Sequence, residues 1–391
     1  MRFPEFTEEW KEERLSKIAE LSKGVGISKE QLSEDGEPCI LYGELYTKYK
    51  SEIIHKVISK TNIESSNLKR SKRNDVIIPC SGETAIDIAV ARCVPFDNIL
   101  LGGDLNIIRL HKDDGAFMAY QLNGKRKIDI AKLAQGVSVV HLYGENIKAI
   151  KTYNPCLQEQ QKIVKLLSML DERIEVQNKI IEDLKKLKSA ISKHLFARKD
   201  LLETTICLSN IATLKNGYAF QSSKYNVLGK WKILTITNVS GERYINDEDC
   251  NSIINLPNDI QDHQVLKEGD ILISLTGNVG RVSLCKNGDY LLNQRVGLLQ
   301  LAKNVNQEFL YQILSSQKFE NSMIACGQGA AQMNIGKGDV ESYVLPYSSN
   351  GNNILWVAKI LHSYDECIIN EMRRLTLLTM QKQYLLTQMF I

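Results

Sequence analysis

Two long segments of the chain repeat apolar residues at a spacing that alternates between four and three positions. The first series contains Ile163, Leu167, Leu170, Ile174, Gln177, Ile181, Leu184, Lys188, Ile191 and Leu195. The second contains Val357, Leu361, Tyr364, Ile368, Glu371, Leu375, Leu378, Lys382, Leu385 and Met389. A mean period of 3.5 residues over several heptads is typical of a coiled-coil helix. Asn154 and Pro155 suit the cap and the first turn of the first helix.

Both series interrupt their apolar residues at the same two places, which suggests a register. If the helices pair antiparallel with residue numbers that sum to 559, Lys188 lies opposite Glu371 and Gln177 lies opposite Lys382. Because a lone buried charge is costly and a matched polar layer can fix register, we favour this pairing. In the alternative, the charged groups reach solvent and each helix packs on its own globular unit. The predicted seam comprises Ile174, Gln177, Ile181, Leu184, Lys188, Ile368, Glu371, Leu375, Leu378 and Lys382.

Outside the two helices, short apolar runs alternate with Gly, Asn and Asp residues, a pattern that predicts strands and turns. The clearest runs are 76–78, 99–101, 107–108, 271–273 and 298–299. They indicate mixed sheets with a few short helices, for instance near residues 7–22 and 308–321.

The chain also repeats itself at half its length. Leu15-Ser16-x-Ile18-Ala19 returns as Leu208-Ser209-x-Ile211-Ala212, and residues 75–78 match 270–273. The helical segments match at an offset of 194. We therefore predict an α+β fold with two similar mixed-sheet domains and two long helices that form an antiparallel coiled coil, related by a pseudo-twofold axis. The expected boundaries are 1–154 and 200–350 for the domains, and 155–199 and 351–391 for the helices.

This arrangement would place two related domains at opposite ends of a rod. Residues 170–195 alone span about 39 Å at the helical rise per residue. That length is close to one turn of B-DNA, at which two reading heads meet successive major grooves from one side. Two similar but different heads on a fixed spacer suit an asymmetric DNA sequence in two parts.

Composition narrows the class of protein. With 391 residues, 24% charged and 43% hydrophobic, the chain is an ordinary globular protein rather than a disordered or fibrous one. We find no apolar run long enough to cross a bilayer and no signal-peptide core near Met1, so we expect a cytoplasmic protein. The nine cysteines are scattered without metal-ligand spacing, so we expect reduced, structural thiols and no metal site.

Charge is distributed unevenly along the chain. Lys and Arg exceed Asp and Glu by one in residues 1–154, by four in 155–199 and by one in 351–391, whereas residues 200–350 carry 12 basic against 15 acidic side chains. No segment is basic enough to hold DNA phosphates unaided.

The helix and the repeat together resemble the specificity subunit of type I restriction-modification systems. The segment from Pro155-Cys156-Leu157-Gln158-Glu159-Gln160-Gln161 through Leu170-Asp171-Glu172 to Leu195-Phe196 looks like the central conserved helix of that family. The Leu15-Ser16 motif and the turn at Gly269-Asp270-Ile271-Leu272 are similar to its recognition domains. The resemblance covers essentially the whole chain. It departs at Asn352-Asn353-Ile354, where the second helix lacks the Leu-x-Glu-Gln start, and at Arg73-Asn74-Asp75, where the second copy has Glu268-Gly269-Asp270.

The resemblance implies a DNA-binding chain that is not itself an enzyme and holds no cofactor. In that family the specificity subunit binds double-stranded DNA and two modification subunits, which carry S-adenosylmethionine and methylate adenine at N6. Restriction subunits complete an endonuclease complex that needs ATP and magnesium. Each recognition domain reads one part of the split target, and flipping of the target base belongs to the partners.

Motifs for chemistry in this chain are weak. The stretch 329–338 has the wrong glycine spacing for a P-loop, and Gly338 stands where Ser or Thr would bind magnesium. Tyr153-Asn154-Pro155-Cys156 lacks the second proline and the aromatic residue of an adenine methyltransferase motif. The six histidines are too dispersed to nominate a catalytic base. We therefore expect no enzymatic activity.

Candidate DNA contacts are loop residues, because Gln, Asn and Arg can read base edges in the major groove. In the second domain they are Asn278, Gln294, Arg295, Gln328, Gln332 and Asn334, with Tyr218 and Phe220 as stacking residues. In the first domain, repeat positions nominate Lys23, Ser81, Gln135 and His141. The densest basic run, Lys69, Arg70, Lys72 and Arg73, is a candidate for phosphate contacts.

Each candidate has a simpler interpretation as a solvated or loop-closing residue. The negative charge of residues 200–350 indicates that the isolated chain binds DNA weakly and that the modification subunits neutralise much of the phosphate charge. The alternative function is a coiled-coil scaffold whose heads bind proteins. A symmetric scaffold needs no difference between its heads, whereas these heads share a framework and differ in their loops.

Overall fold

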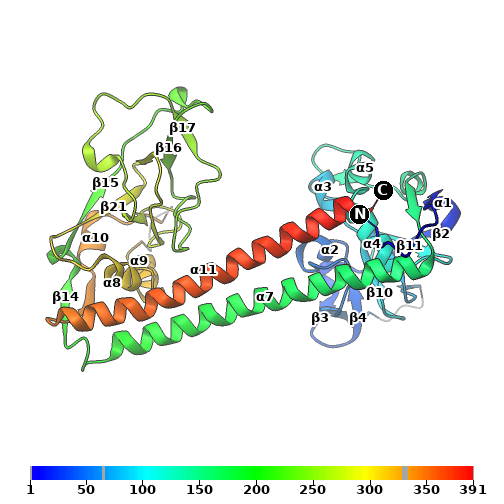
Figure 1. Cartoon of the computed structure of the whole chain (residues 1–391), viewed down its shortest axis with the longest axis horizontal. Coiled ribbons are helices and arrows are strands. Elements are labelled where there is room, and N and C mark those ends of the chain that lie inside the picture. Colours follow the sequence, from blue (N-terminus) through cyan, green and yellow to red (C-terminus); the bar gives the residue numbers. More distant parts are fainter. Residues whose placement is uncertain (1, 64–66, 328–332, 391) are drawn as a thin grey trace. The chain divides into compact units, whose positions relative to one another are not determined.

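The chain forms two compact units, each of which combines a mixed-sheet domain with parts of both long helices. The computed structural model describes residues 2–63, 67–327 and 333–390. Unit 1 comprises residues 1–178 and 373–391, and unit 2 comprises residues 179–372. The helices α7 (Leu157–Ala197) and α11 (Gly351–Gln388) contribute residues to both units (Figure 1). They run for 41 and 38 residues because proline is absent and glycine occurs only at the first position of α11.

Unit 1 is built on two sheets. The first is antiparallel with the order β2-β11-β7-β9, formed by β2 (Ala19–Lys23), β7 (Asp75–Pro79), β9 (Arg92–Val94) and β11 (Leu105–Leu110). The second is mixed, with the order β3-β5-β4-β10-β6, formed by β3 (Leu32–Ser33), β4 (Glu37–Ile40), β5 (Ser59–Thr61), β6 (Lys69–Arg70) and β10 (Leu100–Leu101). Two small pairs complete it: β1 (Lys11–Arg14) with β13 (Lys151–Asn154), and β8 (Ser81–Gly82) with β12 (Val140–His141).

The helices of the unit 1 domain are short. They are α1 (Leu15–Ile18), α2 (Glu44–Thr47), α3 (Ala85–Ile88), α4 (Gly115–Asn123), α5 (Lys127–Lys132) and α6 (Gly144–Lys148).

Unit 2 repeats the same plan. Its four-stranded antiparallel sheet has the order β15-β21-β18-β19, with β15 (Ala212–Asn216), β18 (Ile271–Ser274), β19 (Val282–Leu284) and β21 (Val296–Leu301). A three-stranded sheet contains β17 (Asn251–Ile253), β16 (Trp231–Leu234) and β20 (Tyr290–Leu292), and β14 (Thr204–Cys207) pairs with β22 (Val344–Tyr347). The helices are α8 (Gln307–Leu314), α9 (Gln317–Gly327) and α10 (Lys337–Glu341). The predicted repeat is therefore confirmed in three dimensions.

The central strands are continuously apolar because both faces of the four-stranded sheet are covered. In unit 1, Val76 and Ile78 face a core that includes residues of α4, whereas Ile77 faces the core shared with the five-stranded sheet. Unit 2 repeats this alternation, since Ile271 and Ile273 pack in the α8 core and Leu272 packs in the core beneath the three-stranded sheet. All five apolar runs predicted as strands lie wholly or mainly in strands.

The predicted helix over residues 7–22 is wrong. Only Leu15–Ile18 are helical, and the flanking residues form β1 and β2. The pairing Lys11↔Asn154 places β1 beside a strand more than 140 residues away, and β2 pairs with β11. Long-range pairing overrides the local helical pattern here. The prediction near 308–321 is confirmed by α8 and by the first turns of α9.

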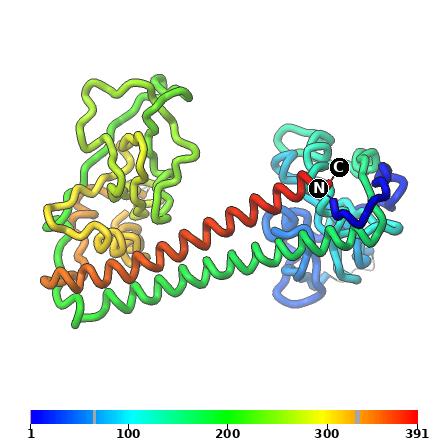
Figure 2. Tube along the Cα trace, in the orientation of Figure 1, coloured from blue at the N-terminus to red at the C-terminus, as the bar shows by residue number. Residues whose placement is uncertain are grey.

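Within each unit, α7 and α11 run in opposite directions. In unit 2, Asn353 of α11 donates to the Leu201 carbonyl just beyond α7, whereas Asp365, further along α11, pairs with Lys188, further back on α7. In unit 1, Lys382 pairs with Asp171, and the last residues of α11 pack with Ile163 and Leu167. Figure 2 follows the chain end as it returns to the N-terminal segment of unit 1, and there Phe390 lies 6.4 Å from Trp10 between ring centroids.

The predicted register is wrong by six residues. Lys188 pairs with Asp365 rather than Glu371, and Lys382 pairs with Asp171 rather than Gln177, so residue numbers in both ion pairs sum to 553 instead of 559. The physical reason is that both carboxylates lie one position beside the seam, where hydrogen bonds from the domains hold them. Of the predicted seam, Gln177, Ile181 and Ile368 are buried, and Ile174, Leu184, Lys188, Glu371, Leu375, Leu378 and Lys382 are half-buried.

Candidate nucleic-acid interface

The nominated residues of unit 2 gather at one end of its four-stranded sheet. Tyr218 follows β15, Asn278 follows β18, and Gln294 and Arg295 precede β21. In antiparallel neighbours, the end of one strand lies beside the start of the next, so these segments meet. The backbone N–H of Tyr218 donates to the Leu292 carbonyl, and the N–H of Gln294 donates back to the Tyr218 carbonyl.

A second set of hydrogen bonds joins the remaining segments to this end of the sheet. The N–H of Leu275 donates to the Arg295 carbonyl, and the N–H of Ile335 donates to the Leu275 carbonyl. The Thr276 hydroxyl donates to Asn334 Oδ1 over 3.0 Å. Asn278, Gln294, Arg295 and Asn334 are exposed. Gln328 and Gln332 lie outside the described residues. Four of the polar candidates therefore share one solvent-facing surface, which we call the unit 2 loop surface.

The loop around residues 277–280 needs glycine at its ends. Gly277 has φ +72° and Gly280 has φ +79°, in the left-handed region that other residues adopt at a cost. Asn278 is carried on this turn. Tyr218 and Phe220 contact each other with tilted rings whose centroids lie 4.9 Å apart, and the Tyr218 hydroxyl donates to Asp259 over 2.8 Å. This hydrogen bond is the main reason that the pKa of Tyr218 is raised above its usual value.

Unit 1 places its nominated residues at the equivalent end of its sheet. Lys23 ends β2, and Ser81 follows β7. The N–H of Leu142 donates to the Cys80 carbonyl, as Ile335 does to Leu275, so His141 corresponds to Asn334 and Ser81 to Thr276. Gln135 exchanges backbone hydrogen bonds with His141. Lys23, Gln135 and His141 are exposed, and the buried Ser81 donates to Asp104 over 3.2 Å. We call this the unit 1 loop surface.

One charged residue of this surface was not nominated from the sequence. The N–H of Cys80 donates to the Asp104 carbonyl, as the N–H of Leu275 does to that of Arg295. Asp104 therefore occupies the position of Arg295, and the two loop surfaces carry opposite charges at one equivalent point. The sequence repeat did not reveal this because the offset here is 191 rather than 193.

The basic run lies elsewhere. Lys72 and Arg73 precede β7, whereas Ser81 follows it, so they lie at opposite ends of that strand. Lys69 and Arg70 form β6 of the other sheet, and Arg70 makes a bidentate ion pair with Glu37. That pair raises the pKa of Arg70 and lowers the pKa of Glu37. The structure does not bring Lys72 and Arg73 to the unit 1 loop surface.

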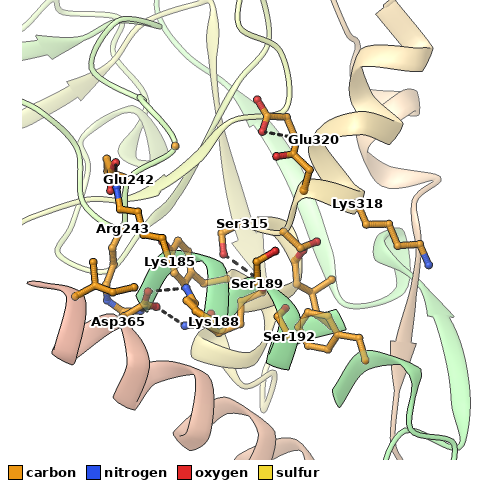
Figure 3. Close-up of a pocket in the computed structure, with 18 of the residues that line it drawn as sticks. Lys185, Lys188, Ser189, Ser192, Glu242, Arg243, Ser315, Lys318, Glu320 and Asp365 are labelled. Atoms are coloured by element: carbon orange, nitrogen blue, oxygen red, sulfur yellow. Dashed lines mark hydrogen bonds and ion pairs between the residues drawn. The ribbon is translucent and has the colours of Figure 1, made fainter. Parts of the chain in front are cut away.

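The sequence also gave no hint of a charged cluster where each domain meets the helices. In unit 2, Arg243 donates to both oxygens of Glu308 and, over 2.9 Å, to Asp365 Oδ2. Gln312 also donates to Asp365, and Lys188 pairs with its other oxygen (Figure 3). Burial alone would lower the pKa of Arg243, but hydrogen bonds and charge from Glu308 raise it.

Unit 1 has a corresponding cluster. Lys382 forms ion pairs with Glu52 and, over 2.5 Å, with Asp171. Asp171 also accepts from the Tyr120 hydroxyl over 2.6 Å, and burial together with this carboxylate raises the pKa of Tyr120 above its usual range. Arg92 is buried close by. Its burial lowers its pKa, although the negative charges of Glu52 and Asp171 act in the opposite direction.

A groove of about 960 Å³ borders the unit 2 cluster. The α7 side chains that line it include Lys185, Ser189 and Ser192, and the domain contributes residues 311–313 and 315–318 among others (Figure 3). Across the described residues, no group of three or more His, Cys, Asp or Glu side chains could hold a metal ion. Within the same part of the chain, no helix is long and apolar enough to cross a membrane.

The fold defines a protein with two similar mixed-sheet domains, each packed on segments of the same two long helices, and comparison with known proteins identifies the family. The family model described as "Type I restriction modification DNA specificity domain" matches twice, over residues 7–186 and 203–380. The chain therefore belongs to the type I restriction-modification DNA specificity family, which confirms the resemblance noted from the repeat and the central helix. It is a specificity subunit, which in this family is a non-catalytic component.

Relatives and solved structures agree with this assignment. The type I restriction enzyme MjaVIII specificity subunit of Methanocaldococcus jannaschii is 26% identical over 342 residues, covering 81% of this chain and 77% of the relative. The S subunit from M. genitalium superposes with a TM-score of 0.60 at 18% identity, covering 100% of this chain and 97% of the other. A chain from a study of assembly and conformational transition of the type I R-M system gives 0.58 at 15% identity, covering 98% and 97%. These structures share the fold, and the scaffold alternative is not favoured.

Proposed function

We propose that each unit reads one part of a bipartite, asymmetric double-stranded DNA target through its loop surface. The observation that carries this proposal is that equivalent loop positions are occupied by different polar side chains. Arg295 stands where unit 1 has Asp104, and Asn334 stands where it has His141. Arg and Asn read guanine and adenine edges, whereas a carboxylate accepts from cytosine. A shared framework with divergent loops is what two different half-sites require.

The same proposal assigns the helices and the partners. The helices α7 and α11 set the spacer between the half-sites and bind two modification subunits, and restriction subunits join the complex. Adenine-N6 methylation and ATP-dependent cleavage belong to those partners, which carry S-adenosylmethionine, ATP and magnesium. This chain contributes binding and orientation only, and it works with the partners in the cytoplasm.

Charge supports a division of labour in DNA binding. Residues 200–350 carry a net charge of −3. Phosphate contacts supply most non-specific DNA affinity. The unit 2 domain therefore depends on partner subunits for phosphate neutralisation, while its own loops supply base contacts.

The direct test uses the complex assembled with its modification subunits. Arg295→Ala should slow methylation of the cognate site by about 5- to 150-fold, which corresponds to the 1–3 kcal/mol of one bidentate base contact. It should also relax preference at one base of one half-site. Lys303→Ala is the matched control, because Lys303 is an exposed cation beyond the opposite end of β21. Equal base preference in both variants and the wild type would contradict the proposal.

A further inference from the structure

We infer that Glu52 and Arg243 are positioning residues that fix the orientation of each recognition domain on its helix segment. The evidence is a pair of buried charge clusters with the same plan. The unit 1 cluster comprises Glu52, Arg92, Asp171 and Lys382, and the unit 2 cluster comprises Lys188, Arg243, Glu308 and Asp365.

Glu52 and Arg243 occupy equivalent positions in the two domains. The N–H of Cys93 in β9 donates to the Glu52 carbonyl, and the N–H of Leu284 in β19 donates to the Arg243 carbonyl. The next residues, Ile53 and Tyr244, form the same isolated parallel bridge with those strand residues. The backbone thus delivers a side chain from the same edge of each four-stranded sheet to the helices.

The helices offer the same partners in both units, but the two domains use opposite charges to bind them. Asp171 and Asp365 are related by the 194-residue repeat, and so are Lys188 and Lys382. In unit 1 the acidic Glu52 pairs with the lysine, whereas in unit 2 the basic Arg243 pairs with the aspartate. The Asp-Lys pair on the helices therefore binds an acidic side chain of the domain in unit 1 and a basic one in unit 2.

Each cluster is balanced within itself. Unit 1 combines the cations Arg92 and Lys382 with two carboxylates, and unit 2 combines Lys188 and Arg243 with two carboxylates. Glu308 of α8 pairs with Arg243. In unit 1, Arg92 lies near Glu52 and Asp171, while its own hydrogen bonds go to the carbonyls of Ala91 and Tyr49. In unit 2, the charge of Arg243 is thus matched by a carboxylate of its own domain, Glu308, as well as by Asp365 on the helix.

Because these ion pairs are buried, they can fix the orientation of each domain on its helix segment. Glu52, Asp171, Arg243 and Asp365 are each at least nine-tenths buried. Apolar contacts such as Leu167 against the end of α11 tolerate repacking, whereas a buried charge that loses its partner costs several kcal/mol. Rotation of a domain about its helix segment would separate these pairs, so the domain keeps one orientation. On the proposed function, that orientation helps to determine the spacer length that the subunit accepts.

The first experiment measures orientation without relying on function. Cys326 on α9 and Cys367 on α11 are exposed native thiols in unit 2. After the half-buried Cys156, Cys207 and Cys250 are replaced by serine, nitroxide labels on the two exposed thiols report the distance between domain and helix.

The test variant replaces all four members of the unit 2 cluster by neutral residues of similar size, so that no buried charge is left alone: K188M, R243M, E308Q and D365N. We expect a folded protein whose label distance distribution is at least twice as wide as in the wild type. The matched control neutralises the exposed pair of Arg198 with Asp200 and should leave the width unchanged. An unchanged width in a folded test variant would overturn the inference.

The second experiment measures the consequence for DNA in the assembled complex. Substrates carry both half-sites separated by the native spacer or by one base pair more or less. The neutral variant should lower the preference for the native spacer at least 5-fold and leave base preferences in the half-sites unchanged. A wider label distribution with an unchanged spacer preference would overturn the link to spacing. If the wild type shows no spacer preference, the proposed function fails, and the label distances still decide the positioning role.

Discussion

In unit 2, Lys188 Nζ lies 2.5 Å from Asp365 Oδ1, and this ion pair joins α7 to α11 at the point where the domain also binds. The 194-residue repeat maps Lys188 onto Lys382 and Asp365 onto Asp171, which form the corresponding pair in unit 1. The helices thus present an equivalent ion pair to each domain, and the domain residue that joins it is acidic in unit 1 and basic in unit 2. The stability of each unit should depend on these groups more than on any surface ion pair.

Removal of the lysine from the unit 1 cluster should be strongly destabilising. Lys382→Met leaves the carboxylates of Glu52 and Asp171 buried without their shared cation, so we expect a loss of about 3–5 kcal/mol in the free energy of unfolding. Guanidinium unfolding of the full chain checks this. Lys186→Met breaks an exposed pair with Glu182 and should cost less than about 1 kcal/mol. Equal losses in the two variants would refute the assigned role of the cluster.

Acid should weaken the unit 2 cluster through Glu308. Burial raises the pKa of this carboxyl, but hydrogen bonds from Arg243 and Gln312 outweigh burial and hold it below the usual value of 4.5. A lowered folded-state pKa contributes stability above the unfolded-state pKa, and this contribution is lost as the pH falls through the folded-state pKa.

The measurement compares melting temperatures of the wild type and Glu308→Gln from pH 7 to pH 3. The wild type should be more stable at neutral pH. The difference should shrink as the pH falls below about 4.5, because Glu308 is then protonated first in the unfolded state and, at lower pH, in the folded state as well. A difference that stays constant over this range would show that the ionised carboxylate is not what stabilises the cluster.

Phe390, two residues beyond the end of α11, should act as an apolar anchor of unit 1. Phe390 is buried against Phe117, with ring centroids 5.4 Å apart, and against Trp10. Phe390→Ala should lower the free energy of unfolding by about 3–5 kcal/mol, as expected for removal of a buried aromatic ring. Tyr384→Ala, at an exposed position on α11 a few residues earlier, is the control for the loss of an aromatic ring that is not buried. Similar melting temperatures for Phe390→Ala and the control would exclude an anchoring role.

The isolated chain should bind DNA weakly. Residues 200–350 carry a net negative charge, so few phosphates are neutralised in that domain. Fluorescence anisotropy with a labelled duplex, measured with and without the modification subunits, tests this. We expect assembly to raise affinity by at least 10-fold at 150 mM salt. Tight binding by the chain alone that resists added salt would contradict the division of labour.

Periodicity and repetition in the sequence predicted the architecture because the pattern of apolar residues along each element reflects which of its faces is buried. The runs at 76–78 and 271–273 are apolar throughout because both sheet faces are covered, and the heptads of α7 mark its buried seam. The register could not be predicted in this way. Asp171 and Asp365 lie beside the seam. Hydrogen bonds from Tyr120 and Gln312, which are distant in the sequence, hold these carboxylates where the lysines pair with them.

The loop surfaces were predicted in part. The repeat offset correctly matched Ser81 with Thr276 and His141 with Asn334. The two four-stranded sheets have the same strand order, so equivalent loops lie at the same end of each sheet. The repeat offset missed Asp104, since 24 positions separate Asp104 from Cys80, whereas only 20 separate Arg295 from Leu275. It also missed Glu52 and Arg243, because their similarity lies in backbone hydrogen bonds while their side chains have opposite charges.

The most direct test of the account is a genome-wide map of methylated adenines in cells with and without this gene, made with the partner genes intact. The account predicts one bipartite motif, with two different parts and a fixed spacer, that is methylated in the first case and unmethylated in the second. Identical methylation in both strains would contradict it.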